Sequence, residues 1–142
     1  MAVRVQSEPF DAAAEARALT AGRADVGAVV TFVGLCRDEG GTLAALELEH
    51  YPGMAEEEIS RVVAEAQARW PLMGATAIHR YGKIAPGEDI VLVVTASAHR
   101  AAAFAARLHE SQLVQSRSRP MHWRQSYSQP GATTYPYRRD SQ

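Results

Sequence analysis

The segment "VGAVVTFVGLC", residues 26–36, is a continuous apolar run rich in β-branched residues. Such a run predicts a buried β-strand. Turn residues follow it in "RDEGG" at 37–41, and "TLAALELEHY" at 42–51 then alternates leucine with glutamate. Because side chains alternate between the two faces of a strand, this second segment should have one face in water. We expect the two strands to pair as a hairpin, which would build the fold around a β-sheet.

Helical and extended patterns alternate irregularly around this pair of strands. The clearest helix is predicted over 52–70, because its apolar residues recur at helical spacing. Other helices are expected at 10–22 and 99–114, strands at 3–6, 75–82 and 90–98, a loop at 83–89 and a last extended segment at 119–128. Since strands and helices mix without strict β-α-β alternation, the predicted fold class is α+β.

Length and composition favour a single globular domain. The 142 residues predict one domain over 1–142, with a loop-like tail from about residue 129. No segment approaches the ~20 apolar residues that span a membrane, and the first residues lack the pattern of a signal peptide. The single cysteine, Cys36, excludes an internal disulfide and fits a reducing cytosol. We therefore expect a cytoplasmic protein without a membrane partner.

Charge is distributed unevenly along the chain. Residues 1–100 carry nine basic and fourteen acidic groups, whereas 101–142 carry six basic and two acidic groups. The overall net charge of −1 argues against a general nucleic-acid binder. The basic C-terminal third predicts either a local anion site or a solvated basic tail.

Three segments place cationic side chains where an anion could bind. Arg37 follows the apolar strand directly, and His99 with Arg100 stands where a strand passes into a helix. Helix N-termini attract anions through unpaired N–H groups, and a guanidinium adds a bidentate donor. The third segment, "QSRSRPMHWRQ" at 115–125, combines three arginines with a tryptophan and suits a planar, phosphorylated ligand. The alternative for each segment is a structural or solvated surface role.

Other kinds of site have little support in the sequence. The five histidines lack metal-ligand spacing, so no metal site is expected. Cys36 has no catalytic signature around it and is interpreted as a small buried residue at a strand end. No phosphate-loop or dinucleotide glycine motif is present.

Four segments, taken in order, resemble a known family. They are "GAVVTFVGLCRD" (27–38), "LELEHYPGMAEEEI" (46–59), "ARWPLMGATAIHRYGKIAPGE" (68–88) and "TASAHRAAAF" (95–104). Together they resemble the large, catalytic subunit of molybdopterin synthase, and the resemblance extends over about residues 3–126. It implies an α+β fold with an α/β-hammerhead element and an additional antiparallel β-sheet.

The resemblance also implies an activity and its partners. A homodimer would form the centre of a heterotetramer, with a small ubiquitin-like sulfur carrier at each far end. The carrier's C-terminal Gly-Gly thiocarboxylate would give sulfur to cyclic pyranopterin monophosphate, which makes the dithiolene of molybdopterin. No cofactor or metal is implied for this sulfurtransferase step.

The resemblance assigns roles to residues in the three cationic segments. Arg37, His99 and Arg100 match substrate-binding positions, and Arg138 matches loosely a tail arginine that reaches the neighbouring subunit. Arg124 stands where the family has a lysine after its tryptophan, so it is predicted to be both catalytic and substrate-binding. The adjacent Gln125 and Ser126 complete the predicted substrate-binding set.

The resemblance also implies a catalytic lysine earlier in the chain, before the tryptophan, and its position here has two alternatives. Counting forward from His99 gives Gln115, and counting back from Trp123 gives Arg117. Neither residue is lysine, and arginine stays protonated where a lysine could lose its proton. The sequence therefore leaves open an active sulfurtransferase that works with guanidiniums and an impaired paralogue that keeps only dimerisation and carrier binding.

Overall fold

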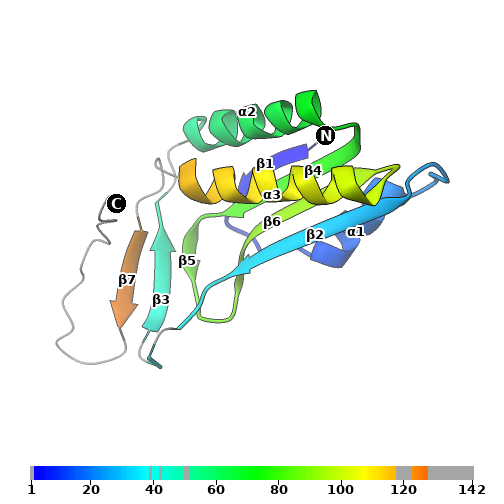
Figure 1. Cartoon of the computed structure of the whole chain (residues 1–142). Coiled ribbons are helices and arrows are strands. Elements are labelled where there is room, and N and C mark those ends of the chain that lie inside the picture. Colours follow the sequence, from blue (N-terminus) through cyan, green and yellow to red (C-terminus); the bar gives the residue numbers. More distant parts are fainter. Residues whose placement is uncertain (1, 39, 42, 50–51, 118–122, 128–142) are drawn as a thin grey trace.

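The computed structural model describes residues 2–38, 40–41, 43–49, 52–117 and 123–127, with side chains up to Arg107 and at His109. The elements are arranged as two β-sheets with three helices (Figure 1). In chain order they are β1 (Ala2–Gln6), α1 (Ala12–Thr20), β2 (Ala28–Leu35), β3 (Leu43–Leu48), α2 (Met54–Arg69), β4 (Leu72–Arg80), β5 (Gly82–Ile84), β6 (Asp89–Ser97), α3 (Arg100–Arg117) and β7 (Trp123–Tyr127).

The larger sheet is built around β6. Its four strands lie in the order β1-β4-β6-β2, with β1 parallel to β4 and the other neighbours antiparallel. Residues Ile90 to Ser97 of β6 are all buried, as expected for a central strand whose two faces are both covered. Helices α2 and α3 cover one face of this sheet and α1 covers the other (Figure 1).

Apolar side chains on alternate strand positions form the two layers of this core. On one face, Ile59 and Val63 of α2 pack with Ala77 and Val91 of the sheet. On the other face, α1 contributes Ala16 and Leu19 to a cluster with buried sheet residues. The apolar stripe predicted for α2 is confirmed at its buried positions, which are Ile59, Val62, Val63 and Ala66.

The predicted hairpin between residues 26–36 and 42–51 is wrong. β2 pairs with β6, from Ala28 opposite Ser97 to Leu35 opposite Asp89, whereas β3 pairs with β5 and β7 in a second sheet. The physical reason is that β6 offers β2 a long apolar partner, while β3 has one apolar face and one glutamate-bearing face. The expected wet face of β3 is confirmed, since Glu47 is exposed between buried neighbours.

The second sheet is antiparallel, with strand order β5-β3-β7. The loop expected at 83–89 is wrong at its start, because β5 occupies Gly82–Ile84 and Ile84 is fully buried. The α+β class is confirmed, and so is an antiparallel sheet additional to the helix-covered element. Within the described ranges, every helix is too short or too polar to cross a membrane.

Ile84 lies in the apolar cluster that joins the second sheet to the segment before Arg37. Its neighbours there include Cys36, Leu48 and Ile90. We expect Ile84→Ala to lower the free energy of unfolding by about 2–5 kcal/mol, because it leaves a cavity, and Ile84→Val by only about 0.5–1.5 kcal/mol. Urea denaturation followed by circular dichroism measures both, and equal losses in the two variants would contradict this packing.

Candidate functional site

Arg37 is exposed and directly follows Cys36 at the end of β2. The backbone on both sides of it is fixed by hydrogen bonds. The Cys36 N–H donates to the Glu88 carbonyl at 2.8 Å, and the Gly87 N–H donates to the Cys36 carbonyl at 2.7 Å. After Arg37, the Asp38 carboxylate accepts a hydrogen bond from the Leu43 N–H at 3.0 Å. The guanidinium therefore projects from a backbone held at both ends.

His99 and Arg100 are exposed at the start of α3. The His99 N–H lies 3.3 Å from the Ser97 hydroxyl oxygen, which accepts its hydrogen bond, and the His99 carbonyl accepts from the Ala103 N–H. No acidic residue stands in the first turn of α3. The positive end of the helix dipole and the Arg100 guanidinium could therefore act together on an anion at this point.

The sheet fixes the direction from which α3 begins. The Thr95 hydroxyl is fully buried and donates a 2.8 Å hydrogen bond to the Ala103 carbonyl. The Ser97 hydroxyl donates to the Pro71 carbonyl at 2.9 Å. These contacts anchor the first turn of α3 to β6 and to the segment before β4.

The remaining predicted residues lie in α3 and β7 or outside the described residues. Gln115 and Arg117 belong to the last turn of α3. In β7, Arg124 lies opposite Glu47 of β3, and Gln125 and Ser126 occupy the next two register positions. The structure describes the backbone at these five positions and not their side chains, and Arg138 lies wholly outside the described residues.

The strand pairing places the cationic segments at two ends of the molecule. Because β2 and β6 are antiparallel, Arg37 lies beside the start of β6, and His99 follows its end. The eight residues of β2 span about 25 Å. The eighteen residues of α3 run about 27 Å back from His99 toward the end that carries β3, β5 and β7 (Figure 1). Arg37 and β7 therefore lie at the same end of the molecule, and His99 and Arg100 lie at the opposite end.

Cys36 lies beside Arg37 with its side chain in the core. It is 4% exposed and packs in the apolar cluster with Leu46 and Ile84. Burial raises the pKa of the Cys36 thiol, and the nearby carboxylates of Glu88 and Asp38 raise it further. The thiol is therefore protonated at neutral pH, and the interpretation of Cys36 as a buried residue is confirmed.

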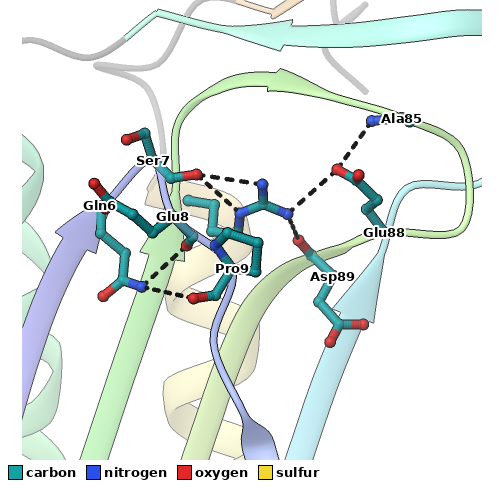
Figure 2. A network of polar contacts seen from close by, with 8 residues as sticks. Gln6, Ser7, Glu8, Pro9, Ala85, Glu88 and Asp89 are labelled. Atoms are coloured by element: carbon teal, nitrogen blue, oxygen red, sulfur yellow. Dashed lines mark hydrogen bonds and ion pairs between the residues drawn. The ribbon is translucent and has the colours of Figure 1, made fainter.

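Sequence reasoning missed a buried arginine that organises the turn beside Arg37. Arg80, at the end of β4, is 5% exposed. Its Nε and Nη2 donate to the Ser7 carbonyl at 3.3 and 3.2 Å, and its Nη1 donates to the Asp89 carbonyl at 2.8 Å. Figure 2 shows these contacts together with the Glu88 carboxylate. The sequence signal that could have revealed it is the position of Arg80 at the end of an apolar strand. An arginine buried there needs polar partners.

The described residues contain no group of three or more histidine, cysteine, aspartate or glutamate side chains that could hold a metal ion. The arrangement instead offers guanidiniums and a helix N-terminus, which recognise phosphate and carboxylate groups.

The chain belongs to the MoaE protein family, whose model matches residues 5–109. The match includes Arg37, His99 and Arg100. A molybdopterin synthase catalytic subunit from Mesorhizobium japonicum is 73% identical over 104 residues, which are 73% of this chain and 65% of the relative. Another, from Cereibacter sphaeroides, is 48% identical over 132 residues, which are 93% of this chain and 89% of the relative.

The solved structures include a molybdopterin cofactor biosynthesis protein E from Burkholderia multivorans. It is similar to this chain with a TM-score of 0.78 and 40% sequence identity, over 89% of this chain and 86% of that one. The chain spans about two thirds, 65–66%, of the length of the first four curated relatives.

The protonated thiol of Cys36 has a consequence for its reactivity. Alkylation requires the thiolate and access to solvent, so at pH 7 we expect iodoacetamide to leave native Cys36 unmodified and to label it fully in urea. Mass spectrometry of the intact chain measures the label. Rapid labelling of the native protein would show that Cys36 is accessible and ionised, contrary to its place in the core.

Proposed function

We propose that this chain is the catalytic subunit of a molybdopterin synthase, a sulfurtransferase. It would take sulfur from the C-terminal Gly-Gly thiocarboxylate of a small ubiquitin-like carrier and give it to cyclic pyranopterin monophosphate. The observation that carries the proposal is the family match over residues 5–109, which includes the exposed cations Arg37, His99 and Arg100. The reaction would take place in the cytoplasm, which suits the reduced Cys36.

The cationic side chains define what the site could do. A guanidinium binds a phosphate with two parallel hydrogen bonds and stays protonated at all working pH values. Arg37 and Arg100 are therefore proposed to hold the substrate phosphate, and Arg117 and Arg124 to stabilise negative charge that develops during sulfur transfer. Because none of these guanidiniums can act as a base, proton transfer in this enzyme would fall to His99, water, substrate or carrier.

The separation of the cationic segments supports a homodimer with shared sites. One substrate cannot contact Arg37 and Arg100 of the same chain across about 25 Å. A second copy related by twofold symmetry could bring its own His99 and Arg100 to the Arg37 end of the first, and symmetry would then create two such sites. This dimer would be the centre of a heterotetramer with one carrier at each site, and Arg138 would also act at the neighbouring site.

The impaired-paralogue alternative has no observation in its favour. This alternative was considered because Arg124, and either Gln115 or Arg117, stand where the family has lysine. Charge stabilisation does not require lysine, and the relatives with up to 73% identity carry the name of the catalytic subunit. We therefore propose an active enzyme.

The activity is tested by mixing the chain with thiocarboxylated carrier and cyclic pyranopterin monophosphate and measuring molybdopterin. We expect product from the unmodified chain and a loss of about 10²–10³-fold in Arg124→Ala, as for removal of an oxyanion donor. Arg61→Ala, which removes an exposed arginine paired with Glu58 on α2, is the matched control and should retain full rate. Carrier binding without product in the unmodified chain would contradict the proposal.

The shared site is tested by co-expressing two variants that each have strongly reduced activity. Arg37→Ala and Arg100→Ala chains should together recover about a quarter of the unmodified activity, because half of the dimers are mixed and each mixed dimer has one intact site. Arg37→Ala with Arg124→Ala should recover nothing, since both residues would belong to the same chain's half of the site. No recovery in the first pair would show that each site is built from one chain.

A further inference from the structure

We propose that Arg80 and Glu88 are positioning residues for Arg37, which they hold through the turn Ala85–Glu88. This inference rests on the proposed function, in which Arg37 binds the substrate phosphate. Neither residue is proposed to contact the phosphate itself. They act by fixing the backbone from which the Arg37 guanidinium extends.

The Arg80 side chain is held in one orientation by its hydrogen bonds. Its side chain is 6% exposed and makes hydrogen bonds to the carbonyls of Ser7 and Asp89. A planar guanidinium can bond in several directions at once, and an ammonium cannot reproduce this geometry. The two carbonyls belong to the segment after β1 and to the first residue of β6, so Arg80 joins two strands that flank β4. This leaves its Nη1 fixed in place facing the Glu88 carboxylate at 3.5 Å.

Glu88 closes the turn Ala85–Glu88. Pro86 and Gly87 occupy its central positions, and the positive φ of 86° at Gly87 is that of a type II turn. The Glu88 N–H donates to the Ala85 carbonyl at 3.1 Å. Its Oε2 accepts a second hydrogen bond from the Ala85 N–H at 3.2 Å, as well as the contact from Arg80 (Figure 2). One carboxylate thus ties the two ends of the turn to the buried arginine.

This turn is connected to Arg37 through the preceding residue, Cys36. Two backbone hydrogen bonds, through the Glu88 carbonyl and the Gly87 N–H, hold Cys36 as a short extension of β2 beyond its last paired residue. The register between β2 and β6 is irregular between Gly34 and Leu35. The turn therefore takes over where regular strand pairing ends, and it fixes the residue immediately before Arg37.

Positioning of this kind matters because Arg37 is exposed on the surface. A side chain on a loose segment must lose conformational freedom when it binds, and the binding affinity falls accordingly. A backbone held before binding avoids that loss. The side chain of Glu88 is 47% exposed, so its removal should loosen the turn without opening the core. Glu88 is therefore a better test position than the buried Arg80.

The experiment compares Glu88→Ala with Glu15→Ala, a matched control that breaks the ion pair between Arg4 of β1 and Glu15 of α1. Helix α1 lies across the larger sheet from α2 and α3. Glu88→Ala should raise KM for cyclic pyranopterin monophosphate about tenfold and change kcat less than about threefold, as expected for lost substrate binding. Glu88→Gln keeps an acceptor oxygen and should recover most of the loss. In an Arg37→Ala background, Glu88→Ala should have no further effect on KM.

Hydrogen exchange at the Cys36 amide provides a readout that does not depend on activity. Its exchange rate should rise at least about tenfold in Glu88→Ala and stay unchanged in Glu15→Ala. Unchanged exchange, or a KM effect that adds fully to that of Arg37→Ala, would overturn the positioning role. Absence of product from the unmodified chain, together with faster exchange in Glu88→Ala, would instead contradict the proposed function and leave the structural link intact.

Discussion

The antiparallel pairing of β2 with β6 is the constraint on which the rest of the molecule depends. β6 is buried on both faces, so it can lie only at the centre of the larger sheet. Its start lies beside the segment that carries Arg37, and its end leads into His99 and Arg100. The pairing therefore builds the core and also holds the two sets of cationic groups apart by the length of a strand.

Each cationic end is supported by hydrogen bonds to the backbone around it. At the Arg37 end, a buried arginine and a tight turn hold the backbone through carbonyl and amide groups. At the other end, the Thr95 and Ser97 hydroxyls anchor the start of α3. Guanidiniums and helix N–H groups supply binding and charge stabilisation but no base, so the proposed chemistry depends on how well they are placed.

Much of the fold could be predicted from the sequence, because its long elements carry local signals. The buried stripe of α2 and the apolar run of β6 are examples. The predicted hairpin was wrong because strand pairing depends on competition between strands that are distant in sequence. β6 is a better partner for β2 than β3 is. β5 was missed because three residues carry too little periodicity to distinguish them from a loop.

The sequence predicted which residues belong to the candidate site, but it did not predict how these residues are arranged in space. Arg37, His99 and Arg100 stand at the ends of elements, which sequence patterns reveal. Their separation follows from strand direction, which no local pattern contains. Arg80 was overlooked because its partners are mainly backbone carbonyls, from Ser7 and Asp89, and such partners have no signature in the sequence.

A crystal structure with cyclic pyranopterin monophosphate bound tests most directly the claim that the strand pairing divides the site between two chains. We expect a ligand whose phosphate lies within hydrogen-bond distance of Arg37 of one copy and of His99 or Arg100 of a second. A ligand that contacts Arg37 and Arg100 of the same chain, or one bound in a monomer, would contradict it.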